Sequence, residues 1–320
     1  MIAGSMILAL AGGVGGAKLA DGLAHVVAPD ELTIAVNTAD DFTHLGLHVS
    51  PDLDTVMYTL AGLNNPETGW GLAGESWAFM AALERLGGET WFRLGDQDLA
   101  THVERTRRLN AGETLSAVMA DLAARLGVRH PIVPMSDDPV RTMVLIDSGR
   151  LAFQDYFVRL QCAPRVSGFE FDGAEAARPS PALSSLLRPG AISACVVCPS
   201  NPFVSVDPIL AVPDIASWLA RRAFPLVAVS PIVGGRALKG PAAKMMAELG
   251  AEVSALGIAR HYRDLIDGLV IDTSDEALAP AIEAEGPRVA VTGTVMRTAA
   301  DRARLAENVI SFAKTLEAKT

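Results

Sequence analysis

Residues 6–20 read MILALAGGVGGAKLA, and this segment carries the clearest structural signal of the chain. The apolar run Met6–Leu10 is short and ends in glycines, which predicts a buried strand followed by a loop. The loop Gly12–Gly16 holds more glycines than a turn needs, and glycines let a backbone approach phosphate oxygens closely. A helical pattern follows over Ala17–His25. We therefore predict that this unit holds the phosphates of a nucleotide.

The glycine loop matches neither standard phosphate-binding motif. In the dinucleotide fingerprint Gly-x-Gly-x-x-Gly, read from Gly13 and Gly15, Lys18 occupies the place of the third glycine. The P-loop requires Gly-Lys-Ser/Thr, whereas Ala17-Lys18-Leu19 stands here. A tight turn that binds no ligand is the alternative interpretation.

The same alternation of strand, loop and helix recurs along the chain. The apolar runs are continuous rather than alternating, as expected for a parallel sheet covered on both faces. This pattern predicts an α/β fold with a doubly wound, Rossmann-like, mostly parallel sheet. The predicted strands are Met6–Leu10, Leu32–Val36, Ala194–Cys198, Leu226–Ser230, Leu269–Ile271 and Val289–Val291. The clearest helices are Ala17–His25, Pro51–Leu60, Pro241–Leu249 and Ala299–Leu316.

An inserted region interrupts the alternation. Its first part shows mainly helical patterns, and its second part resembles β structure. Thr142–Ile146 and Leu151–Gln154 flank the segment Asp147-Ser148-Gly149-Arg150, a predicted hairpin turn. We expect a nucleotide-binding core over residues 6–64 and 176–320, and an inserted cap of helices and a β-hairpin over residues 65–175 that contributes to an acceptor site.

Composition limits the possible functions. Half of the 320 residues are hydrophobic and a fifth are charged, which supports a sizeable core and argues against disorder. The net charge of −10, without a basic run, argues against nucleic acids and anionic membranes as partners. No apolar run approaches the ~20 residues of a membrane span. Three cysteines form no disulfide framework, so we expect a cytoplasmic protein with a small ligand.

Two further features suggest no ligand site. Met1–Ser5 lack the charged region of a signal peptide, and the natural start is either Met1 or Met6. Cys195 and Cys198 are three positions apart in a predicted strand, so their thiols point to opposite faces and are predicted to pack in the core.

Acidic side chains follow the second predicted strand. Asp40 and Asp41 are adjacent, and two carboxylates suit a hard cation better than a ribose. Ser50-Pro51 predicts a helix start, with Ser50 as the N-cap. Asp52 and Asp54 diverge by about 200° on that helix, so we expect only one to face a site. Asp54 borders apolar positions and needs a cation or donor, whereas the helix dipole alone accounts for Asp52.

Other polar groups are predicted near the same edge of the sheet. Arg93 precedes a turn and can grip an anion with two N–H groups. Asp98 and His102 form an i, i+4 pair, for which a surface pair is the simplest interpretation. Three late loops offer hydroxyl, amide and backbone N–H groups beyond strand ends, where parallel sheets bind ligands. They are Pro199–Pro202, Ser230–Gly235 and Lys239–Pro241.

Taken together and in this order, seven motifs resemble those of the 2-phospho-L-lactate transferases. The resemblance covers nearly the whole chain, from Met6 to the last helix. One departure is Ala39, which stands where members usually carry glycine. The motifs are Gly12–Lys18, Asp40-Asp41, Ser50-Pro51-Asp52-Leu53-Asp54-Thr55, Arg93-Leu94-Gly95-Asp96, Pro134-Met135-Ser136-Asp137-Asp138, Ser200-Asn201-Pro202 and Ser230–Gly235.

The resemblance implies a step in the biosynthesis of the deazaflavin coenzyme F-420. The donor would be lactyl- or enolpyruvoyl-2-diphospho-5'-guanosine. The acceptor would be Fo (7,8-didemethyl-8-hydroxy-5-deazariboflavin), through its ribityl terminal hydroxyl, and GMP would be released. The family requires Mg²⁺ and suggests a homodimer.

The resemblance also implies roles for individual residues. Asp54 and Arg93 correspond to the positions that contact Fo. Asp40 and Asp54 correspond to metal ligands and catalytic residues, with a general-base role for Asp54 as the alternative. The guanosine diphosphate side is expected to comprise Gly12, Gly13, Gly15, Gly16, Lys18, Ser200, Asn201 and Gly234.

Two other functions stand as alternatives. A nicotinamide dehydrogenase is disfavoured by Lys18 and by Asn37, which stands in place of a ribose-binding acid. A nucleotide-sugar-binding regulatory protein of a related family would share the glycine-rich start. The segments Asp52-Leu53-Asp54 and Arg93–Asp98 favour the transferase. No residue distinguishes phospholactate, phosphoenolpyruvate and phosphoglycerate as the donor group.

Overall fold

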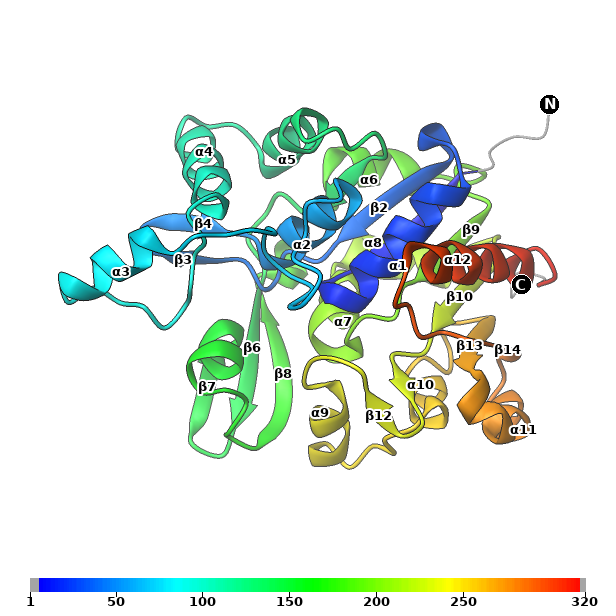
Figure 1. The fold of residues 1–320 in the computed structure, drawn as a ribbon. Helices are drawn as coiled ribbons and strands as arrows, with labels where there is room; N and C mark the ends of the chain where they lie inside the picture. Colours follow the sequence, from blue (N-terminus) through cyan, green and yellow to red (C-terminus); the bar gives the residue numbers. More distant parts are fainter. Residues whose placement is uncertain (1–5, 317–320) are drawn as a thin grey trace.

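The computed structural model describes residues 6–316, so Met1–Ser5, the possible upstream start, lie outside the described part of the chain. Its centre is a sheet of seven parallel strands with helices on both faces (Figure 1). The predicted doubly wound α/β fold is thereby confirmed. From one edge to the other, the strands are β14 (Arg288–Thr292), β13 (Gly268–Asp272), β10 (Leu226–Val229), β9 (Ala194–Val197), β1 (Ile7–Ala11), β2 (Leu32–Val36) and β5 (Ile132–Pro134).

β1 lies between β2 and β9 in the middle of the sheet. The chain first adds β2 and β5 on one side of β1, and then β9, β10, β13 and β14 on the other. In doubly wound sheets, ligands bind beyond the carboxyl ends of the strands where the order reverses in this way. The loops that follow β1 and β9 meet at this point, where the Gly12 N–H donates to the Ser200 hydroxyl over 3.1 Å.

The two faces of the sheet bury separate apolar clusters. Along β1, Leu8 and Leu10 join one cluster, while Ile7, Ala9 and Ala11 join the other. Burial on both faces explains why β1 reads as an unbroken apolar run. One face is covered by α1 (Gly13–Val26), α2 (Pro51–Leu60), α5 (Leu115–Arg125) and α12 (Ala299–Ala313). The other is covered by α6 (Pro181–Leu186), α7 (Asp207–Leu210), α8 (Pro213–Ala220), α9 (Ala242–Glu248), α10 (Ala255–His261) and α11 (Ala279–Ala284).

Two details of these elements bear on the sequence predictions. Cys195 and Cys198 are buried free thiols in opposite clusters, as predicted. α1 begins at Gly13 and not at Ala17, so the prediction of an open glycine loop up to Gly16 was wrong. Gly15 and Gly16 instead belong to the first turn of a helix, whose amino end lies at the carboxyl edge of the sheet.

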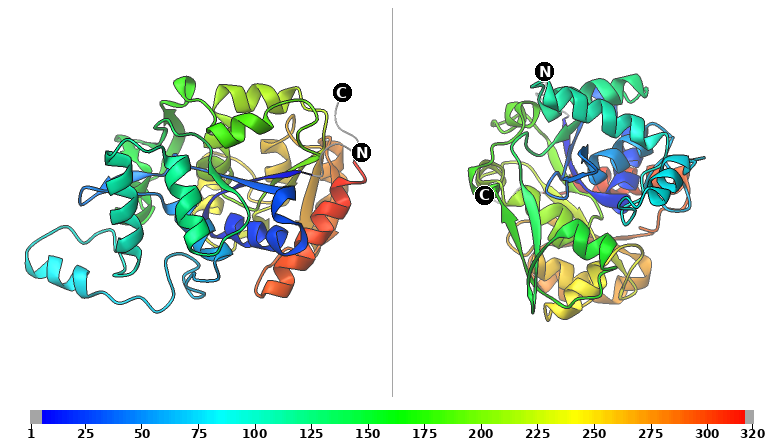
Figure 2. Two further views of the ribbon diagram at one scale, coloured as in Figure 1. Left: turned by 90° about the horizontal axis from the view of Figure 1, so that it is seen from above. Right: turned by 90° about the vertical axis from the view of Figure 1, so that its left-hand side faces the viewer.

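One strand of the central sheet comes from the segment 65–175, which was expected to form the cap. β5 pairs in parallel with β2, and Ile34 is opposite Ile132 in the register. α5, just before β5, packs in the same cluster as α1 and α2. Part of this segment therefore extends the sheet. α3 (Ala78–Arg85) and α4 (Asp98–Asn110) lie beyond it, with α3 at the end of long connections (Figure 2).

Three small antiparallel sheets lie outside the central sheet. β6 (Arg141–Ile146) pairs with both β7 (Gly149–Ala152) and β8 (Val166–Asp172). The predicted hairpin is present, but its turn is shorter than expected because Gly149 already pairs with Ile146. β3 (Phe42–His44) and β4 (Leu47–Val49) form a hairpin that the sequence analysis did not predict. The two-stranded unit of β11 (Ile232–Val233) and β12 (Arg236–Ala237) follows β10.

In the described chain, no single helix has the length and apolarity of a membrane span. The pair Pro202–Leu210 and Pro213–Ala220 meets these criteria only when joined, and it is bent by 85°.

Candidate active site

A cavity of about 630 Å³ opens at the carboxyl edge of the sheet. Its walls come from the loops after β1, β2, β9 and β10, from α2 and α4, and from segments near Trp91 and Phe153. Gly16 and Gly234, also expected at the phosphates, are not among the residues that line it. The predicted site residues that do line the cavity are Gly12, Gly13, Gly15, Lys18, Asp40, Asp54, Arg93, Ser200 and Asn201.

Steric contact explains the glycines at the start of α1. A Cβ placed on Gly15 would lie 2.2 Å from the Pro199 carbonyl oxygen, and one on Gly16 would lie 2.4 Å from the Ser200 hydroxyl. A Cβ on Gly12 would lie 2.5 Å from an oxygen of Asp52. The glycines therefore allow the amino end of α1 to pack directly against its neighbours at the edge of the sheet.

Asp52 lies directly at that helix end. Its carboxylate accepts hydrogen bonds from the Gly13 N–H over 2.8 Å and from the Asn37 amide over 3.0 Å. Burial raises the pKa of Asp52 to about 6, although the bonds from Asn37 and Gly13 oppose that rise. Both Asp52 and Asp54 line the cavity. The expectation that only one could face the site was wrong, because the cavity surrounds the amino end of α2.

The loop after β2 carries the second predicted acid, Asp40. Asp40 is buried, and its Oδ1 has no hydrogen-bond partner among the described residues. Burial raises the pKa of Asp40 well above its usual value, and the neighbouring Asp52 carboxylate raises it further. An unpartnered carboxylate oxygen beside a second acid is unfavourable without a cation. Asp40 therefore fits the proposed role of a metal ligand.

Two other residues of this region differ from expectation. Ser50 stands at the N-cap of α2, but its hydroxyl donates to Asp41 over 2.7 Å and makes no capping bond. Ala39, the departure from the family pattern, is buried in the core, and its N–H donates to the Asn37 side chain over 2.9 Å. Ala39 has no positive φ, so this position does not require glycine.

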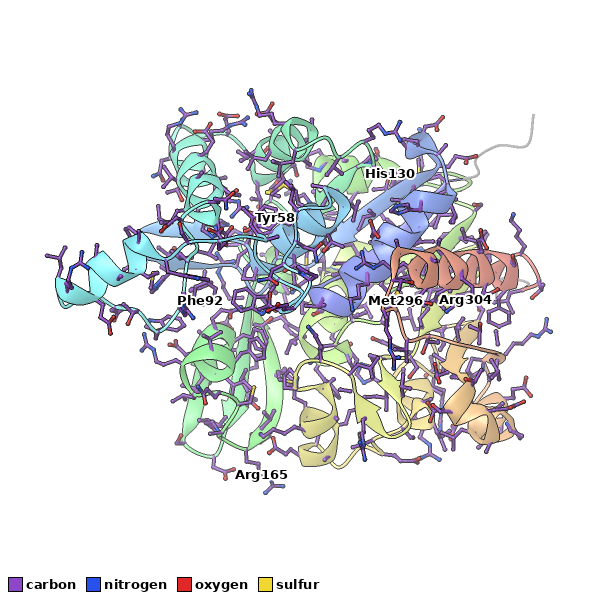
Figure 3. The ribbon with its side chains drawn as sticks, viewed as in Figure 1. Tyr58, Phe92, His130, Arg165, Met296 and Arg304 are labelled. Atoms are coloured by element: carbon purple, nitrogen blue, oxygen red, sulfur yellow. The ribbon has the colours of Figure 1, made fainter. Side chains whose placement is uncertain are left out.

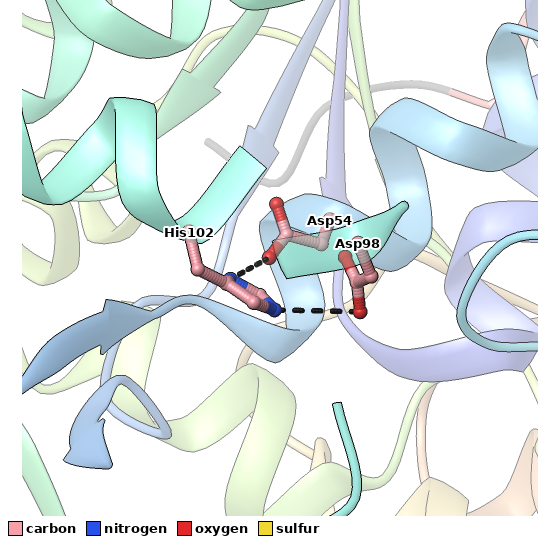
Figure 4. Close-up of side chains that lie close together, drawn as sticks. All are labelled: Asp54, Asp98 and His102. Atoms are coloured by element: carbon pink, nitrogen blue, oxygen red, sulfur yellow. Dashed lines mark ion pairs between the residues drawn. The ribbon is translucent and has the colours of Figure 1, made fainter. Parts of the chain in front are cut away.

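Asp54 belongs to a buried charged cluster (Figure 4). Arg105 from α4 is fully buried and donates to both oxygens of Asp54, with Nη1 at 3.1 Å from Oδ2. His102 lies between two acids, with Nδ1 3.7 Å from Asp54 Oδ2 and Nε2 3.3 Å from Asp98 Oδ2. Burial raises the pKa of Asp54, and Arg105 limits that rise.

This cluster overturns the simplest interpretation of Asp98 and His102. His102 is 2% exposed, so the two residues do not form a surface pair. Asp98 also accepts a hydrogen bond of 2.6 Å from the Tyr58 hydroxyl. Ligand atoms of Asp54, Asp98 and His102 lie within 4.8 Å of one another, close enough to share a metal ion. The donor set thus fits a cation at Asp54 as well as at Asp40.

Aromatic side chains form another part of the cavity wall. Arg93 lines the cavity and its guanidinium lies 4.0 Å from the centre of the Trp77 ring. Phe153 and Phe157 stack with ring centres 5.3 Å apart. Tyr58 in α2, and Phe92 and Met296 in two separate loops, line the cavity and are labelled in Figure 3. This wall suits a flat, apolar ring system.

The remaining predicted phosphate ligands differ in their contacts. The Lys18 ammonium donates to the Met296 carbonyl over 3.1 Å. Burial lowers the pKa of Lys18, and the nearby cations Arg302 and Lys239 lower it further. The Gly234 N–H donates to the Asp275 carboxylate over 3.0 Å. Gly234 therefore holds two protein loops together.

Sequence reasoning missed Asp52 and Arg105 as site residues and misread His102. A usable signal was present, because Asp98, His102 and Arg105 are spaced four and three apart and so share one helix face. Asp54, the partner of His102 and Arg105, belongs to another helix, and this pairing is visible only in the structure.

Comparisons with known proteins give the family of the chain. A family model described as 2-phospho-L-lactate transferase CofD matches residues 7–308. A phosphoenolpyruvate transferase of Kitasatospora aureofaciens is 42% identical over 315 residues, covering 96% of this chain and 98% of the relative. A 2-phospho-L-lactate transferase of Methanococcoides burtonii is 36% identical over 308 residues, covering 96% and 99%.

A solved structure supports the fold alone. A member of the UPF0052 family from Bacillus halodurans superposes with a TM-score of 0.64 at 12% identity, covering 96% of this chain and 99% of that one. From the family match and the relatives, the chain belongs to the 2-phospho-L-lactate transferase CofD family.

Proposed function

We propose that this protein transfers a phospholactyl or phosphoenolpyruvyl group from a guanosine-diphosphate-linked donor to the deazaflavin Fo and releases GMP. One observation carries this proposal. A single cavity contains the amino end of α1, two lysines, three buried carboxylates and an aromatic wall. Phosphates, a cation and a flat ring system can thus meet in one place.

The donor is proposed to bind at the amino end of α1. Backbone N–H groups of a first helical turn favour phosphate oxygens, and Lys18 adds a positive charge. Ser200 and Asn201 line the cavity from the loop after β9, at the reversal of the strand order. A nucleotide in this crevice occupies the usual position for a doubly wound sheet.

The acceptor is proposed to bind on the side of α4. The deazaflavin ring would lie against the aromatic wall, with Arg93 as a donor at its edge. The ribityl hydroxyl would then reach Asp54, which Arg105 holds in one orientation. This hydroxyl oxygen attacks the phosphorus that carries the C2 oxygen of lactate or enolpyruvate, the bond from that phosphorus to the GMP oxygen breaks, and the hydroxyl proton goes to a base.

Mg²⁺ is the implied metal, and Asp40 and Asp54 are its proposed ligands. When bound, Mg²⁺ would neutralise charge on the diphosphate during the displacement. Asp40 supplies a carboxylate oxygen that lacks a protein partner. Asp54 either shares the metal or accepts the hydroxyl proton, and His102 beside it can take that proton onward to Asp98.

The names of relatives guide the choice of donor. Four relatives of 40–42% identity are named phosphoenolpyruvate transferases. Relatives named 2-phospho-L-lactate transferases are 34–38% identical. The phosphoenolpyruvyl donor is therefore the first to test.

The alternative is a regulatory protein that binds a nucleotide sugar without turnover. The two functions differ in GMP release. Incubation with Fo, Mg²⁺ and the guanylylated donor should release GMP only when all three are present. Binding of a uridine diphosphate sugar without any GMP release would favour the regulator, and binding of NAD but not GDP would favour the dehydrogenase.

A further inference from the structure

The loop Asn65–Gly71 covers part of the cavity beside the amino end of α1. Thr68, Trp70 and Gly71 line the cavity from this loop. The loop has internal order, because the Asn65 N–H donates to the Gly71 carbonyl and the Gly69 N–H donates to the Asn65 carbonyl, each over 2.9 Å. It is therefore a formed structural unit.

Two contacts seat this loop on the rest of the protein. Gly69 is buried, and a Cβ on it would lie 2.6 Å from Val14 Cγ1 in the first turn of α1. The Lys239 ammonium, from the segment after β12, donates to the carbonyls of Glu67 and Thr68 over 3.1 and 2.7 Å. Lys239 thus joins two loops that line the same cavity.

Two lysines, Lys18 and Lys239, lie near the amino end of α1 in the cavity wall. Both line it, and in the described chain neither forms an ion pair with a carboxylate. The two ammonium groups are close enough for Lys239 to help lower the pKa of Lys18, after burial and Arg302. In a chain with 37 acidic and 27 basic residues, two such lysines without acidic partners point to an anionic ligand.

The donors of Lys239 are only partly used. An ammonium group has three N–H donors, and Lys239 uses two of them in hydrogen bonds to the Glu67 and Thr68 carbonyls. The third is available to an oxygen in the cavity. Lys239 can therefore hold the Asn65–Gly71 loop and bind a phosphate at the same time.

We propose that Lys239 is a binding residue for the diphosphate of the nucleotide donor, and that a bound donor thereby stabilises the Asn65–Gly71 loop that Lys239 holds. This inference rests on the proposed function, because it requires a nucleoside diphosphate at the amino end of α1. It assigns recognition of the diphosphate to a residue outside the glycine-rich segment.

Calorimetric titration of GDP and GMP into the full chain tests the inference. Lys239→Gln should weaken GDP binding by about 10- to 100-fold, as expected for a lost charge-assisted hydrogen bond. GMP, which lacks the second phosphate, should lose less than about threefold. Lys239→Arg should keep most of the GDP affinity. Lys314→Gln, an exposed lysine at the end of α12, is the matched control and should bind as the wild type does.

Amide hydrogen exchange tests the coupling. GDP should slow exchange in residues 65–71 of the wild type and have little effect there in Lys239→Gln. Unchanged GDP affinity in Lys239→Gln, or equal losses for GDP and GMP, would overturn the inference while leaving the proposed function intact. A wild-type chain that binds no GDP would instead overturn the proposed function, and the inference with it.

Discussion

Arg105 and Asp54, 51 positions apart, form a buried ion pair in which the guanidinium donates to both carboxylate oxygens. Arg105 is fully buried, and although burial alone would lower its pKa, the Asp54 carboxylate raises it. A carboxylate held in this way has a fixed orientation. Asp54 is thereby positioned toward the cavity by α4, a helix of the inserted segment.

Asp54→Asn is expected to reduce turnover by at least about a thousandfold, because either proposed role of Asp54 needs its negative charge. The substitution also leaves Arg105 without its counter-charge, so the free energy of unfolding should fall by about 3–5 kcal/mol. Turnover should be measured well below the melting temperature of the variant, with circular dichroism to verify folding. Near-normal activity would rule out both roles.

Arg93→Ala is expected to raise KM for Fo, with a smaller effect on the donor. Arg93 is exposed and contacts Trp77, so its loss should change the melting temperature little. Steady-state kinetics with each substrate varied in turn gives the KM for Fo and the KM for the donor. Arg85→Ala, at the far end of α3, is a matched control with an expected unchanged KM. An unchanged Fo KM in Arg93→Ala would contradict the placement of the acceptor.

The central strands other than β5 could be predicted because each is a largely apolar run, which burial on both faces explains for all of them except the partly exposed edge strand β14. β5 was assigned to the cap because it is three residues long, ends in Pro134 and follows a long insertion. Its place in the sheet depends on pairing with β2, almost a hundred residues earlier.

The candidate site was predictable in part for a similar reason. Gly12 and Asp40 were singled out because they follow predicted strands, and Arg93 because it precedes a turn; all three line the cavity. Arg105 was not found, because its spacing from Asp98 and His102 places the three on one face of α4 but does not show that this face is buried. Its burial depends on Asp54, which tertiary packing brings to it. Gly234 was misplaced because its N–H is used by Asp275, a residue of another loop.

Gly15→Ala is expected to destabilise the protein by about 1–3 kcal/mol, because the new methyl group would overlap the Pro199 carbonyl oxygen, 2.2 Å from the Cβ position. Thermal denaturation measures the effect. Gly293→Ala is the control, because the nearest atom to its Cβ, in the Arg304 side chain, is 3.9 Å away. Equal melting temperatures for the two variants would contradict the close packing at the start of α1.

Magnesium should stabilise the protein more at about pH 7.5 than at about pH 5. Burial raises the pKa of the proposed ligand Asp40 well above its usual value and that of the neighbouring Asp52 to about 6, so this pair takes up a proton in the folded state as the pH falls. That proton stabilises the folded state at low pH, and the benefit is lost as the pH rises. Above about pH 6, the buried carboxylates of Asp40 and Asp52 are unfavourable in their ionised form unless a cation is bound beside them.

The measurement is the melting temperature with and without Mg²⁺ at both pH values. The increase caused by Mg²⁺ should be several degrees at the higher pH, smaller at the lower pH, and nearly absent in Asp40→Asn. Glu307→Gln, in α12, is a control that should retain the full increase. An equal increase in Asp40→Asn and the wild type would place the metal elsewhere.

The central claim is that this cavity joins a guanylylated donor to Fo. Its test is incubation of the purified protein with Fo, Mg²⁺ and each of the phosphoenolpyruvyl, phospholactyl and phosphoglyceryl donors, followed by mass spectrometry of the deazaflavin. The account predicts, with at least one donor, an Fo product heavier by the phosphoenolpyruvyl, phospholactyl or phosphoglyceryl group of that donor, together with one equivalent of GMP. Unmodified Fo with all three donors, from a folded protein that binds GDP, would contradict it.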